Sequence, residues 1–228
     1  MTLVLDTAPF LLTFRLALVT TLILFLIAVP LAYWLAYSRY KVKFAVEALV
    51  SMPLVLPPTV LGFYLLLAFS PENYLGRFFD EVFGLRLVFT FPGLVLASVI
   101  YSLPFMVQPI RAGFAGIPKA WLDAAHTLGK NQWLTLTRVL LPNMKNALLT
   151  GAVLSFAHTV GEFGVVLMVG GNIPGETRVI SVAIYNEVEA MNYREANAYS
   201  LILIGFSFTV LLITYLINHH KNQVLGYD

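Results

Sequence analysis

The sequence predicts an all-α protein that crosses a membrane five times, with its N-terminus outside the cell and its C-terminus in the cytosol. Of its 228 residues, 59% are hydrophobic and only 11% are charged, whereas a soluble domain carries about 25% charged residues. The mean hydropathy is +0.81. Five long apolar stretches and an uneven distribution of cations complete the basis for this prediction.

Each apolar stretch is long enough to cross a bilayer as a helix, because about 20 helical residues span about 30 Å of hydrocarbon. The expected spans, within one domain that covers residues 1–228, are 13–37, 48–70, 88–110, 146–170 and 196–218. We expect the first stretch to be a span and not a signal peptide. Its apolar run is too long for one, and residues 1–12 contain no Lys or Arg.

The distribution of Lys and Arg sets the predicted orientation. The connections after spans one and three, together with the C-terminal tail, hold nine of the fourteen: Arg39, Lys41, Lys43, Arg111, Lys119, Lys130, Arg138, Lys145 and Lys221. Cytoplasmic loops of membrane proteins carry an excess of such cations. The long polar loop at residues 112–142 is therefore expected to face the cytosol.

This loop has the pattern of two short helices joined by a tight turn. Pro118 suits the first turn of a helix, and Gly129 is placed to end that helix in a left-handed conformation. Asn131 can cap a second helix, which we expect Pro142 to close.

Ala124 and Ala125 give the first of these helices a small-residue face, which allows another protein to approach the backbone closely. An amphipathic helix on the inner leaflet, anchored by Trp121, is the alternative interpretation. The composition of the loop does not choose between the two.

The spacing of seven residues in this loop resembles the "EAA" loop of ABC-importer permease subunits. The matching positions are Asp123, Ala124, Ala125, Gly129, Val139, Leu141 and Pro142. Asp replaces the Glu of the family pattern and Val replaces its Ile, which keeps charge and shape. The resemblance implies a type I ABC-importer permease fold. It also implies that the loop couples the membrane helices to a separate ATPase subunit.

Two further segments resemble the permeases of oxyanion importers, which carry molybdate, tungstate and sulfate. They are PLVLPPTVLG at residues 53–62 and VGEFGVVLMVGGNIPGETR at residues 160–178. The run from Asn172 to Arg178 is most similar to molybdate permeases. The resemblance therefore implies a subunit that translocates molybdate, with tungstate as a second substrate. A sulfate or thiosulfate permease of the same family stays open.

The same resemblance implies the partners and the location of the protein. The partners are a second copy of the chain, two ATP-binding subunits that bind ATP and Mg, an extracytoplasmic oxyanion-binding protein and the lipid bilayer. The location is the cytoplasmic membrane of a bacterium or archaeon.

Several activities are not expected of the chain itself. It has no cysteine and no phosphate-binding loop, since its one Gly-Lys pair, Gly129–Lys130, lacks the upstream glycine. A net charge of +2 with no basic run argues against nucleic acid. We therefore expect no catalytic residue, metal ligand or cofactor.

Three prolines interrupt the second apolar stretch: Pro53, Pro57 and Pro58. We expect them to break or kink this span, which a membrane tolerates only where neighbouring helices or water satisfy the freed carbonyls. A span that lines a pore meets that condition, and a bent packing helix is the alternative. Five helices form a thin wall, so a homodimer with the path on its two-fold axis is expected.

Glu162 has the highest expected free-energy cost of any residue in the predicted spans. A carboxylate inside a span must be paired with another group, be protonated or face water. His158 lies four residues earlier, on the same helical face, and is the expected partner. The pair is a candidate outer gate, and a static pair is the alternative. A proton relay in a gradient-driven transporter, or the acid and base of an intramembrane enzyme, are further hypotheses. The enzyme hypothesis lacks a nucleophile or metal cluster.

The outer segments at residues 72–86 and 172–195 are expected to meet the protein that delivers the substrate. Glu187, Glu189 and Glu195 are candidate docking charges, and a solvated face is the alternative. Residues 178–189 are expected to form a short interfacial helix. Hydroxyls, main-chain amides and helix N-termini suit a dianion, but the sequence assigns none of them.

Overall fold

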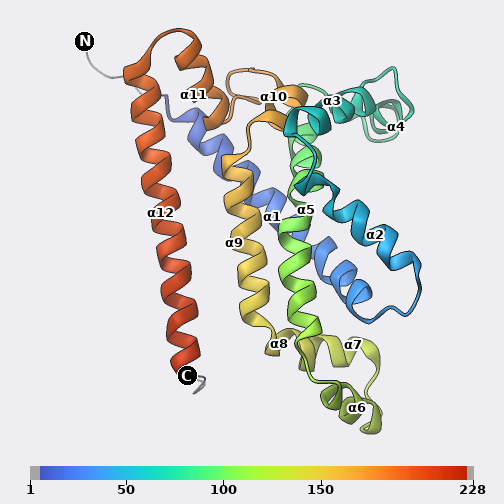
Figure 1. Ribbon diagram of the computed structural model, residues 1–228. Coiled ribbons are helices and arrows are strands. Elements are labelled where there is room, and N and C mark those ends of the chain that lie inside the picture. Colours follow the sequence, from blue (N-terminus) through green and yellow to red (C-terminus); the bar gives the residue numbers. More distant parts are fainter. Residues whose placement is uncertain (1–5, 225–228) are drawn as a thin grey trace.

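The structure is a computed structural model that describes residues 6–224. Within this range all regular structure is helical. Three helices are long and apolar enough to cross a membrane unbroken: α1 (Ala8–Tyr37), α5 (Phe91–Ala115) and α12 (Tyr193–Val224), the last over Tyr193–Thr214. They run along the length of the molecule (Figure 1).

The other two apolar stretches are broken. In the second, α2 (Val42–Ser51) and the 3₁₀ turn η1 (Met52–Leu54) are followed by α3 (Pro58–Phe69) after a bend of 111°. In the fourth, α9 (Lys145–Gly161) and α10 (Gly164–Gly170) are bent by 61°. Counting each bent pair as one span gives up to five spans.

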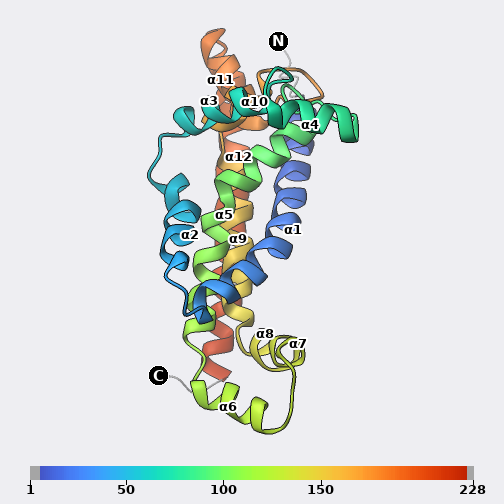
Figure 2. The ribbon, with the colours of Figure 1, turned by 90° about the vertical axis from the view of Figure 1, so that its right-hand side faces the viewer.

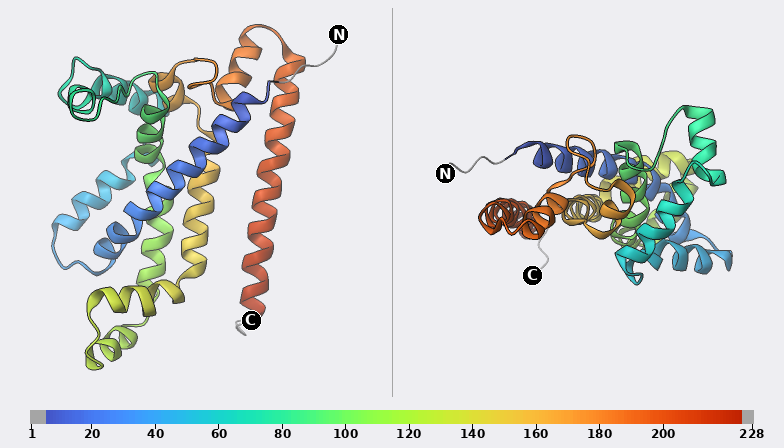
Figure 3. Two further views of the ribbon diagram at one scale, coloured as in Figure 1. Left: turned by 180° about the vertical axis from the view of Figure 1, so that it is seen from behind. Right: turned by 90° about the horizontal axis from the view of Figure 1, so that it is seen from above.

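The helix α1 crosses the bundle obliquely and packs on α5 and α9 (Figures 1 and 3). Along α1 the buried side chains include Leu24, Ala28, Ala32 and Leu35, which share one helical face. Small residues in this stripe let helix backbones approach closely. Met106, Val107, Ile110 and Phe114 of α5 meet this stripe and form the lower core.

Short helices cap the end of the bundle at which α1 begins. Asn73 caps α4 (Tyr74–Phe83), and Gly84 ends it at φ 64°. The helix α11 (Ile180–Glu189) occupies the stretch where a short interfacial helix was expected. The hydroxyl of Thr13 accepts a hydrogen bond of 2.8 Å from the Ile180 N–H, which joins α11 to α1.

The opposite end carries a hairpin of short helices, residues 119–143. It consists of α6 (Lys119–Thr127), α7 (Gln132–Thr135), the π turn η2 (Leu136–Leu140) and α8 (Leu141–Asn143). The start of α1 and this hairpin lie at opposite ends of the molecule (Figures 1 and 2).

Seen from above, the helices form an open row and not a closed ring, with α12 at one edge and α2 near the other (Figure 3). This shape agrees with the thin wall expected from five helices.

Candidate functional site

The turn of the hairpin has the geometry that the sequence predicts. Gly129 has φ 68°, in the left-handed region, and the Lys130 N–H donates to the Ala125 carbonyl at 3.0 Å. The side chain of Asn131 accepts from the Leu134 N–H at 2.8 Å and caps α7. The predictions for Gly129 and Asn131 are confirmed.

The prediction that Pro142 closes the second helix is wrong. The chain stays helical through α8 and leaves the helix at Met144. The π turn before α8 has hydrogen bonds from residue i to residue i+5, one residue further than in an α-helix. Pro142 follows it in the first turn of α8. The missing N–H of a proline costs little at that position.

The two alanines of the hairpin face in different directions. Ala124 is exposed, whereas Ala125 is only 5% exposed within its own chain. The expected shared face for another protein is therefore limited to Ala124. Val139 and Leu141 pack against the lower core and anchor the hairpin to the bundle.

Two exposed apolar side chains of the hairpin escaped the sequence analysis. Leu128 is 73% exposed at the tip of the turn, and Trp133 is 71% exposed on α7. Gly129 and Pro142 are also exposed. The signal for Leu128 was its position directly before the glycine of the predicted turn.

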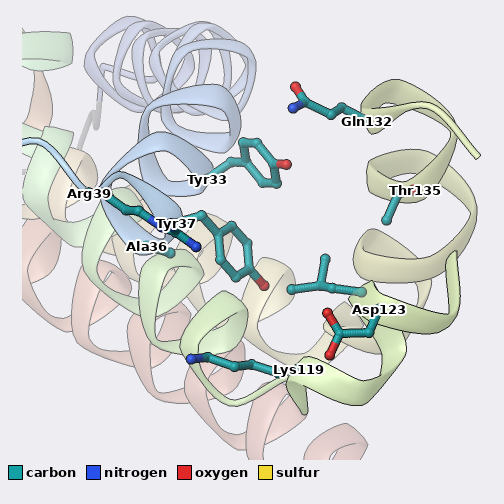
Figure 4. A pocket seen from close by; sticks show the side chains of 9 residues that line it. Tyr33, Ala36, Tyr37, Arg39, Lys119, Asp123, Gln132 and Thr135 are labelled. Atoms are coloured by element: carbon teal, nitrogen blue, oxygen red, sulfur yellow. The ribbon is translucent and has the colours of Figure 1, made fainter. Parts of the chain in front are cut away.

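A cavity of about 430 Å³ separates the hairpin from the end of α1. Figure 4 shows Tyr33, Tyr37 and Arg39 on one side of it and Gln132 and Thr135 on the other, with Lys119 and Asp123 below. The Tyr37 hydroxyl donates to the Phe114 carbonyl at 2.9 Å, so it is already engaged with α5. The hairpin is thus anchored through α5 and α9, with open space toward α1.

A polar clamp joins α2, the first half of the broken second span, to α5. Arg111 forms an ion pair with Glu47, and the Gln108 amide donates to the Ser51 hydroxyl at 2.8 Å. Each clamp residue of α2 therefore has a partner on the helix that leads into the hairpin. The sequence analysis missed this clamp, since Glu47 and Arg111 lie one position outside the spans expected at 48–70 and 88–110.

The two broken spans meet through their second halves, at a contact between α3 and α10 that we call the junction. A Cβ atom added to Gly164 would lie 2.8 Å from Cβ of Pro58, and one added to Gly62 would lie 2.8 Å from Cβ of Met168. Only glycine allows so close an approach at these two positions.

The prolines lie where the predicted break occurs. Pro57 is extended, with ψ 135°, and Pro58 is the first residue of α3. Pro53 is buried within η1. The expected break of span two is confirmed, while its role in a pore stays a prediction.

The expected pair of His158 and Glu162 is not formed. His158 Nδ1 lies 2.9 Å from the Ser102 hydroxyl, and its ring stacks on Phe105 with 3.9 Å between ring centroids. His158 is therefore held by α5 and not by the carboxylate one turn further along α9.

The hydroxyl protons settle which nitrogen of His158 carries hydrogen. The Thr159 hydroxyl donates to the Ser155 carbonyl at 2.9 Å, so it accepts from Ser102 at 3.0 Å. The Ser102 proton is thereby used, so His158 Nδ1–H donates to Ser102. Nε2 of the neutral ring is left as an acceptor.

Glu162 ends α9 at the break of span four. The residue is 3% exposed, and neither carboxylate oxygen has a hydrogen-bond partner. Its main-chain carbonyl accepts from the Ser181 hydroxyl at 2.6 Å, which ties the break to α11. A buried carboxyl group without a hydrogen-bond partner is costly inside a membrane. Glu162 is therefore a functional candidate.

At the end of the bundle that carries α4 and α11, two of the three candidate docking carboxylates have partners within their own segment. Glu187 accepts from the Asn192 amide at 2.9 Å, and Glu189 accepts from the Tyr185 hydroxyl at 2.6 Å. The hydrogen bond to Glu189 raises the pKa of the Tyr185 phenol. Glu195 lies in the first turn of α12.

The Asn172–Arg178 loop at this end is held by its own side chains. Thr177 is fully buried; its hydroxyl donates to the Gly170 carbonyl at 2.6 Å and accepts from the Ile173 N–H at 3.1 Å. Arg178 donates to the Asn172 side chain at 2.5 Å. The loop is therefore a compact structure at the end of α10, with Arg178 turned toward its own chain.

Comparison with known proteins extends over most of the chain. The family described as "Binding-protein-dependent transport system inner membrane component" matches residues 28–223. A molybdenum transport system permease protein of Azotobacter vinelandii is 48% identical over 211 residues, which cover 92% of this chain and 93% of that protein. A probable sulfate transport system permease protein of Chlorella vulgaris is 32% identical over 90% of this chain and 77% of its own length.

The fold also occurs in a solved structure of a bacterial alginate ABC transporter in complex with an alginate-bound periplasmic protein. The similarity to a chain of that structure has a TM-score of 0.72 at 19% identity, over 95% of this chain and 78% of the other. At that level of identity the likeness concerns the fold alone.

Proposed function

Because the chain belongs to the family of binding-protein-dependent transport system inner membrane components, we propose that it is the membrane-spanning subunit of an ATP-driven importer that carries molybdate into the cytosol. The observation that carries this proposal is the 48% identity, over nearly the whole chain, to a molybdenum transport permease. Tungstate, a tetrahedral dianion like molybdate, is the second substrate. The 32% identity to a sulfate permease keeps sulfate or thiosulfate as the alternative.

ATP is hydrolysed by separate subunits that dock on the hairpin. The exposed surface around Ala124, Leu128 and Trp133 supports this role, because it offers apolar side chains around a small residue outside the bundle. Two ATP-binding subunits, which bind ATP and Mg, meet the two hairpins of a dimer. Movement of a hairpin reaches the membrane helices through α5 and the clamp of Glu47 and Arg111.

Two copies of the chain form the transport path. The break in span two leaves Leu54, Val55 and Pro57 exposed, with Val55 at 85%. Irregular backbone at membrane depth is stable only against protein or a water-filled cavity. A second copy that faces α2 and α3 supplies the protein contact, and the transport path between the two copies supplies the water-filled cavity.

The hairpin faces the cytosol and the α4 and α11 end faces outward, in the cytoplasmic membrane of a bacterium. The distribution of cations supports this orientation. The periplasmic binding protein docks at the outer end, where Glu187, Glu189 and Glu195 are the candidate contacts.

The test is uptake by vesicles that contain the chain, the ATPase subunit and the binding protein. We expect ATP-dependent uptake of labelled molybdate and tungstate, with slower uptake of sulfate. Uptake driven by an ion gradient without ATP would instead make the protein a secondary transporter. Faster uptake of sulfate than of molybdate would favour the alternative substrate.

A further inference from the structure

A cavity of about 470 Å³ opens beside the junction of the two broken spans. We call it the junction cavity, and helices α3, α5, α9 and α10 contribute to it. Its lining residues are Pro58, Thr59, Tyr101, Ala157, His158, Gly161, Glu162, Phe163 and Gly164. It therefore lies where three of the five apolar stretches meet.

Two hydroxyl groups of this lining have no hydrogen-bond partner within residues 6–224: that of Thr59, which is exposed on α3, and that of Tyr101, which is half-buried on α5. Thr59 is also the second residue of α3, where a main-chain N–H has no intrahelical acceptor. Free polar groups inside a membrane are costly and mark a substrate path or a water-filled cavity. Two helices thus contribute three hydrogen-bond donors from residues that line this cavity.

Glu162 is a second, independent observation that indicates a functional role for the polar groups at the junction. Its buried carboxyl group is without a hydrogen-bond partner at the edge of the same cavity. Because a carboxylate repels an anion, we assign Glu162 no direct contact. Nε2 of His158 donates only in the charged ring, so the donors assigned here are those of Thr59 and Tyr101.

The lining also contains no Lys or Arg. Passage requires that a bound ion can leave again, which a few neutral donors permit and a fixed cation opposes. Main-chain amides and hydroxyls at a helix N-terminus suit a tetrahedral oxyanion. Small residues leave the space for it: Gly161 is exposed, and a Cβ atom added there meets nothing within 4 Å.

We propose that the junction cavity holds the tetrahedral oxyanion during its passage, with Thr59 and Tyr101 as hydrogen-bond donors. This inference rests on the proposed function and adds a binding site in the membrane domain. A side chain of the second copy is the competing occupant.

Gly161→Cys tests occupancy directly, because the chain has no native cysteine. In the reconstituted complex, we expect a small hydrophilic thiol reagent to modify this cysteine. Molybdate should slow the reaction several-fold relative to chloride at equal ionic strength. Glu72→Cys, exposed at the outer end, is the control and should react at the same rate with either anion.

Filling the cavity tests transport. Gly161→Leu should lower molybdate uptake at least roughly tenfold, because the added side chain enters open space. ATP hydrolysis stimulated by the binding protein should persist. Gly205→Leu on α12 is the matched control, since its Cβ also meets nothing within 4 Å, and its uptake should equal that of the parent.

Removing single donors tests the assigned contacts. Thr59→Val and Tyr101→Phe should each lower the uptake rate roughly 3- to 10-fold, the equivalent of one ordinary hydrogen bond, and should change the ratio of molybdate to sulfate uptake. Thr20→Val is the control, because the Thr20 hydroxyl also has no hydrogen-bond partner but is buried on α1.

Three results would overturn the assignment: an unreactive cysteine at position 161 in an active complex, reactivity that molybdate leaves unchanged, or donor variants that transport like Thr20→Val. The first of these would show that the second copy fills the cavity. If the parent complex itself fails to transport molybdate with ATP, the proposed function fails, which is a separate outcome.

Discussion

Two of the five apolar stretches are broken, and they are broken for different physical reasons. In span two, Pro57 and Pro58 stand together at the break, and the surrounding residues are exposed. In span four the break falls at Glu162 and Phe163, without a proline, and Glu162 is buried. The first break is visible in the sequence, whereas the second depends on contacts with other helices.

Proline alone does not explain even the first break. Pro30 lies inside α1, and Pro104 and Pro109 lie inside α5, and both helices remain continuous. The helix α5 packs against both α1 and α9. In the second span, α3 packs mainly against α10, and we expect this contact to hold the bend. The two breaks therefore form one structural unit.

The largest effect is expected from Gly164→Leu, which separates the two broken spans. A side chain at this position would meet Pro58 at 2.8 Å, and overpacking of this kind costs about 1–3 kcal/mol. We expect a lower thermal midpoint in detergent and loss of uptake. Gly205→Leu is again the control, and equal behaviour of the two variants would contradict the close contact of α3 and α10.

The next effect concerns the buried acid of span four. Glu162→Gln removes the charge and keeps the shape, so relief of an unpartnered carboxylate should raise the thermal midpoint, while uptake falls. Glu162→Ala should reduce uptake at least roughly tenfold with the ATPase subunit still bound. Unchanged uptake in both variants would reduce Glu162 to a packing residue.

The sequence could predict features of this molecule that depend on neighbouring residues. The left-handed Gly129, the cap at Asn131 and the break at Pro57 follow from local backbone chemistry. The burial of Ala125, the bond from His158 to Ser102 and the clamp of Glu47 and Arg111 join residues far apart in the sequence. The helical period places His158 and Glu162 on one face, but it does not show which neighbour that face meets.

A smaller effect is expected at the clamp, which joins span two to α5. The side chains of Arg111 and Glu47 are 35% and 28% exposed, so breaking the pair should cost only about 1 kcal/mol. We expect Glu47→Gln to lower the uptake supported by each ATP hydrolysed, with assembly intact. The exchanged pair Glu47→Arg with Arg111→Glu should restore coupling in part. Failure of the exchange, with coupling intact in Glu47→Gln, would exclude a positioning role for the clamp.

The smallest effect is expected from Pro58→Ala, and it tests whether proline or packing holds span two in its bend. Proline at the first position of a helix has no hydrogen bond to lose, so the exchange should cost about 0.4–1 kcal/mol. If the contact of Gly62 with Met168 holds α3 on α10, the bend of 111° should survive. Spin labels on cysteines at the exposed positions Leu49 and Phe63 report this directly, because a straight helix would place their backbones roughly 21 Å apart.

We expect the distance in Pro58→Ala to equal that in the labelled parent, while Gly62→Leu, which would clash with Met168, should change it. A shift toward the straight-helix distance in Pro58→Ala would show that the proline is the cause, and the two breaks would then have to be treated as independent.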